Sequence, residues 1–496
     1  MAHDGDGPAR AAGVAIAGTL ESTAVAPRWR GAQPRGLIIA LVCGLAIWAV
    51  PVPDGIEPHG WHLFAIFVAT VIGIIVRPLP MAAVAMIGMA AAVFTGTLEM
   101  EEVLTGFSRD TVWLVVAAFL FAGTFIRTGL GRRIAYLFLS LVGHRTLGLS
   151  YSLAATDLVL APFIPSHTAR SGGVVFPVLR SIATSAHASS EGPGPTRTAG
   201  FLTLSTYHSS CVTSAMFLTA MAGNPLAAEL AGAQGVSITW GAWALAALLP
   251  GVVSLALVPL LIQAVHPPAV RHTPNARRQA RQELAALGPM QRDEWILLIV
   301  FGMLLVLWSF GSALGVSSTT AAFGAIAVLL ITGVLLWDHV AGEHEAWTTF
   351  VWFAVLLMMA TELGRLGIPR WFGDVVTSAI GDVGWVPGFL LLSLAYFYSH
   401  YLFASNTAHV AAMYAPFLVI ALALGTPPFL AAIVLGFFSN LFASLTHYAS
   451  ACAPIFFGAG YVPINTWWKV GGIVSVMNIV IWLAVGGIWW KVLGLW

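Results

Sequence analysis

Charge is the scarcest property of this sequence. Of 496 residues, only 22 are Lys or Arg and 21 are Asp or Glu, which is 9 % of the chain, whereas a typical soluble domain carries about 25 %. The net charge of +1 provides no basic surface for a nucleic acid. The three cysteines have neither a CxxC spacing nor the pattern of a metal site. With so little charge, a soluble enzyme, a disordered protein and a nucleic-acid binder are excluded.

What the sequence has instead is apolar length. Hydrophobic residues make up 58 % of the chain, in runs of about 20 residues that match the thickness of a bilayer. Two apolar segments, 149–184 and 385–424, are too long for one crossing, and breaks at 161–166 and 403–407 divide them. A chain that turns at membrane depth forms a re-entrant hairpin, whose irregular backbone must be surrounded by protein or water. The sequence therefore predicts an all-α polytopic membrane protein with about 11 transmembrane helices and two re-entrant hairpins.

The few charges indicate the orientation and the organisation of the chain. Basic and acidic loops alternate, and the positive-inside rule then places the N-terminus in the cytoplasm and the C-terminus outside, in a multi-pass protein of the cell (inner) membrane. Residues 1–36 are expected to be a disordered cytoplasmic leader, and the arginine-rich segment 266–293 a basic cytoplasmic linker. The linker separates a first half, 37–265, from a second half, 294–496. The acidic loop 338–346 departs from the alternation, but acids weigh little in this rule.

The two halves contain an inverted repeat. At an offset of 239 residues, the Ser-x-Thr sequence at the first break recurs at the second. Five predicted crossings separate the two hairpins, and an odd number of crossings gives them opposite orientations. Inverted repeats with broken helices are typical of secondary transporters, which bind their substrate where the broken helices meet. The matched pairs include Ser166 with Ser405, Thr168 with Thr407, Arg170 with His409, and His208 with His447.

The hairpin tips are the first candidate site. Each tip begins a half-helix, and Ser, Thr and Asn are residues that a helix start prefers. The free N–H groups and the positive dipole ends of two facing helix starts would hold an anion, and the hydroxyls would add donors to its carboxylate oxygens. The alternative is that these residues only cap their helices. The candidate substrate-binding residues are Ser166, His167, Thr168, Ser405, Asn406 and Thr407.

The helix after each hairpin adds further candidates. Small polar residues fill 207–214 and 444–454, and we expect both helices to be interrupted there. Unwound backbone at these places would complete the cavity or bind a cation. The alternative is interhelical packing of small polar residues. The candidate side chains are Thr213 and Ser450.

Four longer motifs surround these candidates: PFIPSHTARSGG (162–173), STYHSSCVTSAMFLTA (205–220), FASNTAH (403–409) and HYASACAPIFFGAGY (447–461). With them, residues 36–496 resemble the divalent-anion:sodium symporter family, and within it the branch of citrate/succinate antiporters. The resemblance implies a homodimer in which a moving transport domain carries substrate past a static scaffold domain, an elevator motion. Each domain would draw on both halves of the chain. Substrates of the family are di- and tricarboxylates, some members take sulfate, and the family's substrate contacts fall on the candidates named above.

One departure from the family pattern bears on cation coupling. The resemblance implies Ser-Asn-Thr at both tips, but the first tip reads Ser166-His167-Thr168. In symporters of the family the amide oxygen of that Asn helps to bind sodium, whereas imidazole nitrogen suits zinc or copper far better than an alkali cation. We therefore expect no sodium at His167, and Asn406 is the place where the resemblance still allows a sodium ion. His167 would instead hydrogen-bond a substrate carboxylate.

Charge balance favours exchange. Arg170 and His409 follow the two tips at matched positions, and an arginine at the centre of a spanning helix costs about 2.5–3.5 kcal/mol. We expect both residues to supply fixed positive charge where symporters place sodium, so that the empty carrier is unbalanced and exchanges one carboxylate for another. In the alternatives, Arg170 reaches toward the membrane surface or pairs with a structural acid, or the protein is a sodium-coupled dicarboxylate or sulfate symporter.

Other classes fit the sequence less well. An intramembrane hydrolase would use a Gly-x-Ser-x-Gly elbow or an HExxH metal pair, and neither is present, so no enzyme activity and no cofactor beyond a sodium ion are expected. A passive anion channel would not need two inverted hairpins. The substrate stays open among citrate, succinate, tartrate, malate and 2-oxoglutarate, because hydroxyls and amides bind carboxylates generically. His208 and His447 are expected to pack or to bond to backbone rather than to titrate.

Overall fold

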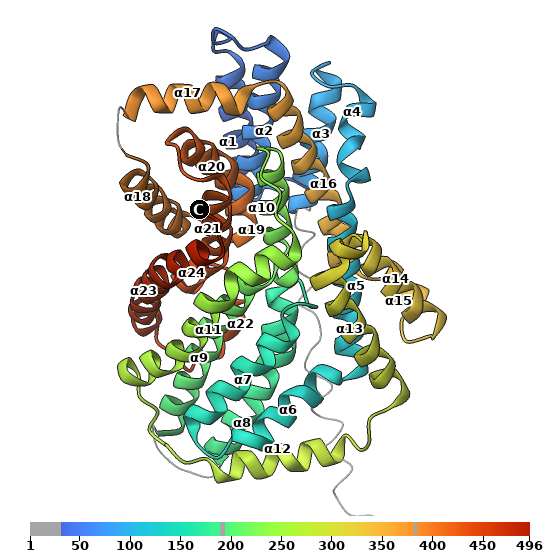
Figure 1. Cartoon of the computed structure of the whole chain (residues 1–496), viewed down its shortest axis with the longest axis vertical. Helices are drawn as coiled ribbons and strands as arrows, with labels where there is room; N and C mark the ends of the chain where they lie inside the picture. The colour runs from blue at the N-terminus through green and yellow to red at the C-terminus, as the bar shows by residue number, and fades with distance from the viewer. Residues whose placement is uncertain (1–30, 189–193, 381–383) are drawn as a thin grey trace, which may run out of the picture.

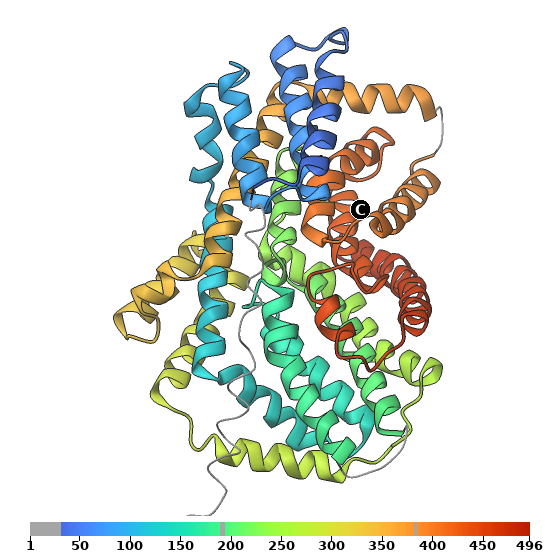
Figure 2. The same cartoon turned by 180° about the vertical axis from the view of Figure 1, so that it is seen from behind.

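The computed structural model describes residues 31–188, 194–380 and 384–496. In this part of the chain the secondary structure is helical, with no β-strand beyond a single isolated bridge. Figure 1 and Figure 2 show the helices from opposite sides. The all-α prediction is confirmed. Most of the predicted leader, 1–36, lies outside the described residues.

Among the described residues, seven helices are long and apolar enough to cross a membrane. Further apolar helices are shorter, between 10 and 17 residues. Helix length alone does not fix the number of crossings, so the count of about 11 stays a prediction. The seven long helices are Pro58–Val76, Asp110–Thr128, Trp240–Val265, Arg292–Phe310, His344–Arg365, Asn406–Ala423 and Ile464–Val492.

Local sequence sets many of the helix boundaries in the first half. Proline stands in the first turn of α1 and α2, where its missing N–H costs nothing. Gly129, with φ of 78°, ends α5 in the left-handed conformation that favours glycine. The elements are α1 (Pro34–Trp48), α2 (Pro58–Val76), α3 (Met81–Phe94), α4 (Met100–Leu104), η1 (Thr105–Ser108), α5 (Asp110–Thr128), α6 (Leu130–Val142), α7 (Thr146–Leu160), η2 (Thr168–Val175), α8 (Phe176–Ala188), α9 (Gly194–Met216), η3 (Leu218–Ala220), α10 (Gly223–Gly232) and α11 (Trp240–Val265).

The second half repeats this order with similar lengths. Helices α18 and α20 begin 239 residues after α7 and α8, the same offset that relates the sequence motifs. The elements are α13 (Arg292–Phe310), η4 (Gly311–Leu314), α14 (Ser318–Ile331), α15 (Trp337–Ala341), α16 (His344–Arg365), α17 (Ile368–Ile380), α18 (Trp385–Tyr398), η5 (Ser399–Leu402), α19 (Asn406–His409), η6 (Val410–Tyr414), α20 (Ala415–Ala423), α21 (Pro428–Leu441), η7 (Phe442–Ser444), α22 (Ala453–Phe457), α23 (Ile464–Val480), η8 (Ile481–Val485) and α24 (Gly486–Val492).

The two halves are arranged in opposite senses. Helices α6 and α17, which precede the two hairpins, lie toward opposite ends of the long axis in Figure 1. Between them, the hairpins pack around α9 and α21, whose central residues are buried throughout. The arrangement agrees with the predicted inverted repeat, because a repeat of the same orientation would bring both helices to one end.

Helices α5 and α16 form a wall beside the hairpins. Segment η1, which precedes α5, packs backbone to backbone against α16. A Cβ added at Gly106 would lie 2.0 Å from the carbonyl oxygen of Ala354, so only glycine permits this approach. Helix α5 belongs to the first half and α16 to the second, so both halves contribute to the wall.

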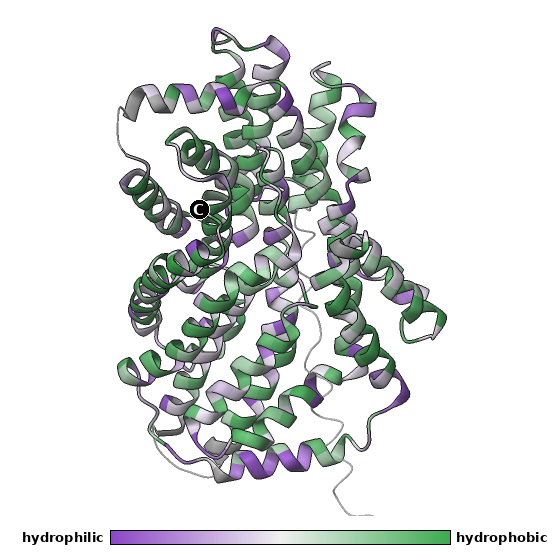
Figure 3. Cartoon of the chain, viewed as in Figure 1, coloured by the Kyte–Doolittle hydropathy of each residue, from purple (hydrophilic) through white to green (hydrophobic). Residues whose placement is uncertain are grey.

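The basic linker contains an ordered helix. In the segment 266–293, helix α12 (Pro274–Ala286) lies across the lower end of the molecule in Figure 1 and is among its most hydrophilic elements in Figure 3. Arg277 Nε donates to the carbonyl of Ser140 in α6 at 2.8 Å, which fixes α12 to the first half.

Candidate functional site

The first hairpin breaks where the sequence removes backbone donors. Pro162 and Pro165 follow the end of α7, and because proline has no N–H, the helix cannot continue through them. Ser166 Oγ then accepts a hydrogen bond from the N–H of Ala169 at 3.2 Å, as an N-capping residue does. Helical structure resumes with the π-helical segment η2. The predicted break at 161–166 is present.

The second hairpin has the same local structure. Ser405 is the N-cap of α19, and its Oγ accepts from the N–H of Ala408 at 3.3 Å. A second π-helical segment, η6, follows at the position that matches η2. Widened helical turns of this kind often occur at functional sites. Ser166 and Ser405 therefore start two half-helices in equivalent ways.

Both tips line a single cavity of about 230 Å³. The six predicted tip residues and Ser450 all contribute to its lining, so the structure brings these candidates together. The rest of the wall comes partly from α5 and α16 and includes a carboxylate, Glu345, which is exposed. The lining residues are Met81, Phe119, Pro165, Ser166, His167, Thr168, Met221, Ala222, Glu345, Thr349, Trp352, Ser405, Asn406, Thr407, Ser450, Ala451 and Cys452.

Two buried side-chain atoms of the cavity residues have no hydrogen-bond partner in the described part of the chain. They are Nδ1 of His167 and Oδ1 of Asn406, and both side chains are buried. The other ring nitrogen of His167 lies 2.6 Å from Ser210 Oγ. The amide nitrogen of Asn406 donates to the sulfur of Met221 at 3.4 Å. Because buried polar atoms are nearly always bonded, these two atoms are candidates for a bond to a ligand or to water.

Arg170 lies behind the first tip and does not line the cavity. Its fully buried guanidinium pairs with the carboxylate of Asp157, Nε to Oδ2, at 3.1 Å. Nη1 donates to the carbonyls of Ile164 at 2.9 Å and Ala220 at 2.8 Å. Nη2 donates to the hydroxyl of Ser214 at 2.7 Å. The guanidinium therefore ties the broken end of the hairpin to the broken end of the helix that follows it.

This arrangement corrects the prediction that Arg170 brings an unbalanced positive charge to the substrate. The carboxylate of Asp157 balances it, as the alternative of a structural acid allowed. Thr213, predicted to contact substrate, instead donates its hydroxyl to Asp157 and does not line the cavity. Sequence reasoning missed Asp157, although it is the only acid in the segment 149–184.

His409, like Arg170, lies behind its tip and not in the cavity lining, where the prediction placed its charge. His409 is fully buried behind the second tip, with Nε2 3.0 Å from Ser399 Oγ and Nδ1 3.3 Å from Nδ1 of His400. Its ring stacks on Tyr396 with the centroids 4.7 Å apart. Tyr396 stands 239 residues after Asp157, so the second repeat has an aromatic ring where the first has a carboxylate. His409 does not line the cavity.

The interruption expected at 207–214 is wrong in position. Helix α9 continues to Met216, and the backbone unwinds only between Met216 and Gly223. The hydroxyls of Ser210 and Ser214 bond to carbonyls three and four residues earlier, at 2.7 and 2.8 Å, so small polar residues are accommodated inside the helix. In the second half, non-helical backbone does lie within the predicted 444–454.

The matched histidines His208 and His447 lie outside the cavity lining. Both ring nitrogens of His208 are buried without a hydrogen-bond partner among the described residues, and its ring packs 5.6 Å from that of Tyr207. His447 Nδ1 accepts from the indole N–H of Trp468 at 3.2 Å. Among the described residues neither histidine bonds to backbone, and the expectation that they do not titrate stays a prediction.

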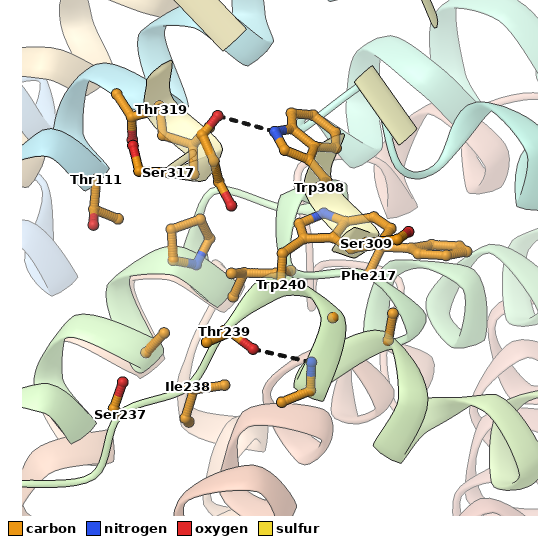
Figure 4. A pocket seen from close by; sticks show the side chains of 18 of the residues that line it. Thr111, Phe217, Ser237, Ile238, Thr239, Trp240, Trp308, Ser309, Ser317 and Thr319 are labelled. Atoms are coloured by element: carbon orange, nitrogen blue, oxygen red, sulfur yellow. Dashed lines mark hydrogen bonds between the residues drawn. The ribbon is translucent and has the colours of Figure 1, made fainter. Parts of the chain in front are cut away.

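A larger cavity, of about 1130 Å³, lies between α10, α11, α13 and α14 and contains none of the candidates. Figure 4 shows its aromatic wall, where Trp240 and Trp308 lie with ring centroids 5.6 Å apart. Its charged lining residues are two acids, Asp110 and Glu229, and no basic residue lines it. The two capped half-helix starts, which are suitable for an anion, line the smaller cavity, so this cavity is the candidate anion site.

A helical membrane protein in which two inverted hairpins meet at one cavity has the architecture of a secondary transporter. The sequence matches the family described as the sodium:sulfate symporter transmembrane region over residues 32–496. The chain belongs to this family, which confirms the family resemblance. Family membership also confirms that the protein is a transporter and not an enzyme.

Named relatives match almost the whole chain. "Putative malate transporter YflS" of Bacillus subtilis is 49 % identical over 462 residues, which cover 93 % of this chain and 96 % of the relative. "Dicarboxylate transporter 1, chloroplastic" of Spinacia oleracea is 47 % identical, with 94 % and 83 % covered. "Inner membrane protein YbhI" of Escherichia coli is 36 % identical, with 92 % and 97 % covered.

A solved structure supports the fold. MtrF of Neisseria gonorrhoeae matches with a TM-score of 0.55 at 12 % identity, and the match covers 91 % of this chain and 97 % of MtrF. At this identity the likeness concerns the fold alone. The match supports the helical fold of this chain.

Proposed function

We propose that the protein is a secondary active transporter of di- and tricarboxylate anions that exchanges one carboxylate for another. The observation that carries this proposal is the shared cavity, into which two equivalent Ser-capped half-helices bring Ser, Thr and Asn side chains. Free N–H groups at helix starts and neighbouring hydroxyls are suitable donors for carboxylate oxygens. The names of the relatives, which refer to malate and dicarboxylates, support the same substrate class.

The charge distribution favours transport without sodium at the first tip. His167 offers ring nitrogens, which are poor ligands for an alkali cation. The carbonyls of Ile164 and Ala220 at the broken ends, which could have coordinated a cation, already accept from Arg170. The residues of the first repeat therefore do not fit a sodium ion. The absence of a sodium site at the first tip supports exchange. An uncompensated charge on the empty carrier no longer supports it, because Asp157 balances Arg170.

Sodium-coupled symport of a dicarboxylate or sulfate is the second candidate. The family description, a sodium:sulfate symporter region, supports symport. A side-chain oxygen of the second repeat supports it as well. Oδ1 of Asn406 is a buried oxygen without a partner in the described residues, which fits a hard cation. A sodium ion there would add positive charge next to a bound anion, while Ser405 and Thr407 would still donate to the anion.

The remaining features of the proposal concern assembly and motion. We propose a homodimer in the inner membrane, with the N-terminus in the cytoplasm and the C-terminus outside. The hairpins would move as a transport domain along the wall of α5 and α16 by an elevator motion. The inner-membrane relative from Escherichia coli supports the location, and the position of the cavity between the hairpins and α5 and α16 supports the motion.

Uptake into proteoliposomes separates the two candidates. Purified protein is reconstituted into vesicles that are empty or preloaded with malate, and uptake of labelled malate is measured with and without sodium. We expect uptake only by preloaded vesicles, independent of sodium. Sodium-dependent uptake by empty vesicles would establish symport instead, and no uptake of any di- or tricarboxylate under either condition would refute the substrate class.

A further inference from the structure

A pair of buried histidines lies directly behind the second tip. His400 in η5 and His409 in α19 are both fully buried, and their Nδ1 atoms lie 3.3 Å apart. Nε2 of His400 lies 2.8 Å from the carbonyl oxygen of Ala449. Because a carbonyl oxygen only accepts hydrogen bonds, this nitrogen carries a hydrogen. Nε2 of His409 lies 3.0 Å from Ser399 Oγ, and the same hydroxyl lies 2.8 Å from the carbonyl oxygen of Tyr396.

This chain of hydrogen bonds has room for one additional proton. The first hydrogen lies on Nε2 of His400, and the contact between the two Nδ1 atoms takes a second one, since it needs one donor and one lone pair. With these two hydrogens both rings are neutral, and Nε2 of His409 accepts from the hydroxyl of Ser399. A third hydrogen has one place, Nε2 of His409, which then donates to Ser399 Oγ while the hydroxyl turns to the carbonyl of Tyr396. All four ring nitrogens have a partner in either state.

Aromatic rings surround His409 as they do in binding sites for cations. The centroid of its ring lies 4.7 Å from that of Tyr396 and 4.5 Å from those of Phe403 and Phe442. Phe442 also stacks on His400, with the centroids 3.8 Å apart and the planes at 17°. A cation within about 6 Å of a ring centroid is attracted by the face of the ring. These three rings, the aromatic cage, therefore favour the charged form of the pair.

No carboxylate in the surrounding elements balances such a charge. Around the pair pack α2, α18, η6, α21, η7 and segment 445–452, and within these ranges and in η5 and α19 the sequence has no Asp, Glu, Lys or Arg. Arg77, the C-cap of α2, is exposed, and its Nη2 donates to the carbonyl of Ala404 at 3.3 Å. The other titratable groups in these elements are Tyr396, Tyr398, Tyr401, Tyr414, Tyr448, His59, His62, His447 and Cys452. A proton on the pair of the empty carrier would be a buried charge without a counter-charge, which is costly.

A bound dianion would supply the missing counter-charge. Ser405, Asn406 and Thr407 line the candidate anion cavity. His409 follows Asn406 by three residues in α19, which is about 4.5 Å along the helix axis. A negative charge at this separation favours the protonated form of a histidine, and the added positive charge in turn favours the anion. The two ligands therefore strengthen each other's binding, and each must do so by the same factor.

We propose that the His400–His409 pair is a proton-binding site, and that a dicarboxylate entering the cavity is bound together with a proton. The inference rests on the proposed function and adds a proton to the substrates. It also accounts for the difference between the two repeats. Arg170 is a permanent cation with its own carboxylate, Asp157, whereas the matched His409 has no acid and becomes a cation only when the substrate brings the negative charge.

Isothermal titration calorimetry counts the protons that accompany binding. Malate is titrated into the purified full-length protein in buffers of equal pH but different ionisation enthalpy, at a pH at which free malate is a dianion. Sodium is present throughout, so that either mode of coupling permits binding. We expect a net uptake that approaches about one proton per malate, and a malate affinity that rises as the pH falls, by up to about tenfold per pH unit. Binding without proton uptake would overturn the proposal. Failure of every dicarboxylate to bind folded protein would refute the proposed function itself.

Variants assign the proton to the pair. His409→Phe keeps a ring in the aromatic cage but has no ring nitrogen, and we expect it to bind malate more weakly and without proton uptake. His447→Phe, at a histidine outside the cavity lining that bonds to Trp468, is the matched control and should keep the uptake. Uptake that persists in His409→Phe would overturn the assignment.

Two further variants decide the assignment even if His409→Phe does not fold. His167 and Glu345 line the cavity and are the other groups there that could take up a proton. We expect His167→Gln and Glu345→Gln to take up as much proton per bound malate as the parent protein. Loss of the uptake in either variant would place the proton in the cavity lining and overturn the proposal.

Discussion

Replacing Asp157 by Asn isolates the energetic role of the ion pair behind the first tip. Both side chains of the Asp157–Arg170 pair are 0 % exposed, so no water can take the place of a lost partner. Asp157→Asn keeps the size of the side chain but removes its charge. The guanidinium of Arg170 would keep its bonds to two backbone carbonyls, which are neutral. It would lose Asp157, its one ion-pair partner among the described residues.

The expected cost is large compared with the stability of a protein. Removing one partner of a buried ion pair costs about 3–5 kcal/mol, whereas total unfolding free energies are about 5–15 kcal/mol. Arg170→Gln should destabilise to a similar extent, since it leaves Asp157 as the unpaired charge. In the double variant Asp157→Asn/Arg170→Gln no charge is left unpaired, so its loss should be several kcal/mol smaller than the sum of the two single losses.

Thermal and denaturant unfolding of the purified variants in one detergent measures these differences. Glu102→Gln is a suitable control, because it breaks a pair with Arg365, whose side chain is 58 % exposed; it should change the stability by about 0–1 kcal/mol. Two results would refute the reasoning. One is additivity of the two single variants. The other is Asp157→Asn of parent-like stability but altered malate affinity, which would mean that the charge of Arg170 acts on the substrate.

Three further predictions concern the cavity and its tips. Glu345→Gln removes the carboxylate from the lining and should tighten malate binding up to about fivefold, because two like charges 4 Å apart in water repel by about 1 kcal/mol. Isothermal titration calorimetry measures the affinity. The control Glu343→Gln, which lies outside the lining, should have a smaller effect. Ser166→Ala and Ser405→Ala each remove an N-cap and should each lower the unfolding free energy by about 0.5–2 kcal/mol, and equal stability with the parent in urea would contradict the capping role. Arg77 is the only non-glycine residue of positive φ, 51°, in the described chain, and this conformation is strained for any residue with a Cβ. Arg77→Gly should therefore be about 1 kcal/mol more stable than Arg77→Ala in the same assay. The reverse order of stability would show that no backbone strain is present.

The breaks and tips could be predicted because their causes are local. Proline removes a backbone donor wherever it stands, and serine before a helix start caps it, so Pro162, Pro165 and Ser405 define the breaks without reference to the rest of the fold. The repeat could be found because both copies keep the same residues at the same offset. The length and composition of the apolar runs were enough for the all-α membrane class.

The partners of the buried charges could not be predicted in the same way. Arg170 pairs with Asp157 across the hairpin break, and the turn of the break decides which side chains meet. The wall residues Phe119, Trp352 and Glu345 belong to helices far from the tips in sequence, so only tertiary packing brings them to the cavity. The error at 207–214 has a different cause. The prediction treats serine and threonine as helix-breaking, whereas inside a helix their hydroxyls can bond to the helix's own carbonyls.

The two repeats solve one electrostatic problem in different ways, and the difference bears on binding. Behind the first tip, a positive and a negative charge cancel; at the matched place behind the second tip, His409 stacks on Tyr396 and faces another histidine, and no described carboxylate pairs with it. A bound dianion therefore meets no uncompensated fixed charge from the matched positions and must be held by N–H groups and hydroxyls. Such donors bind any carboxylate, so they provide affinity without choice.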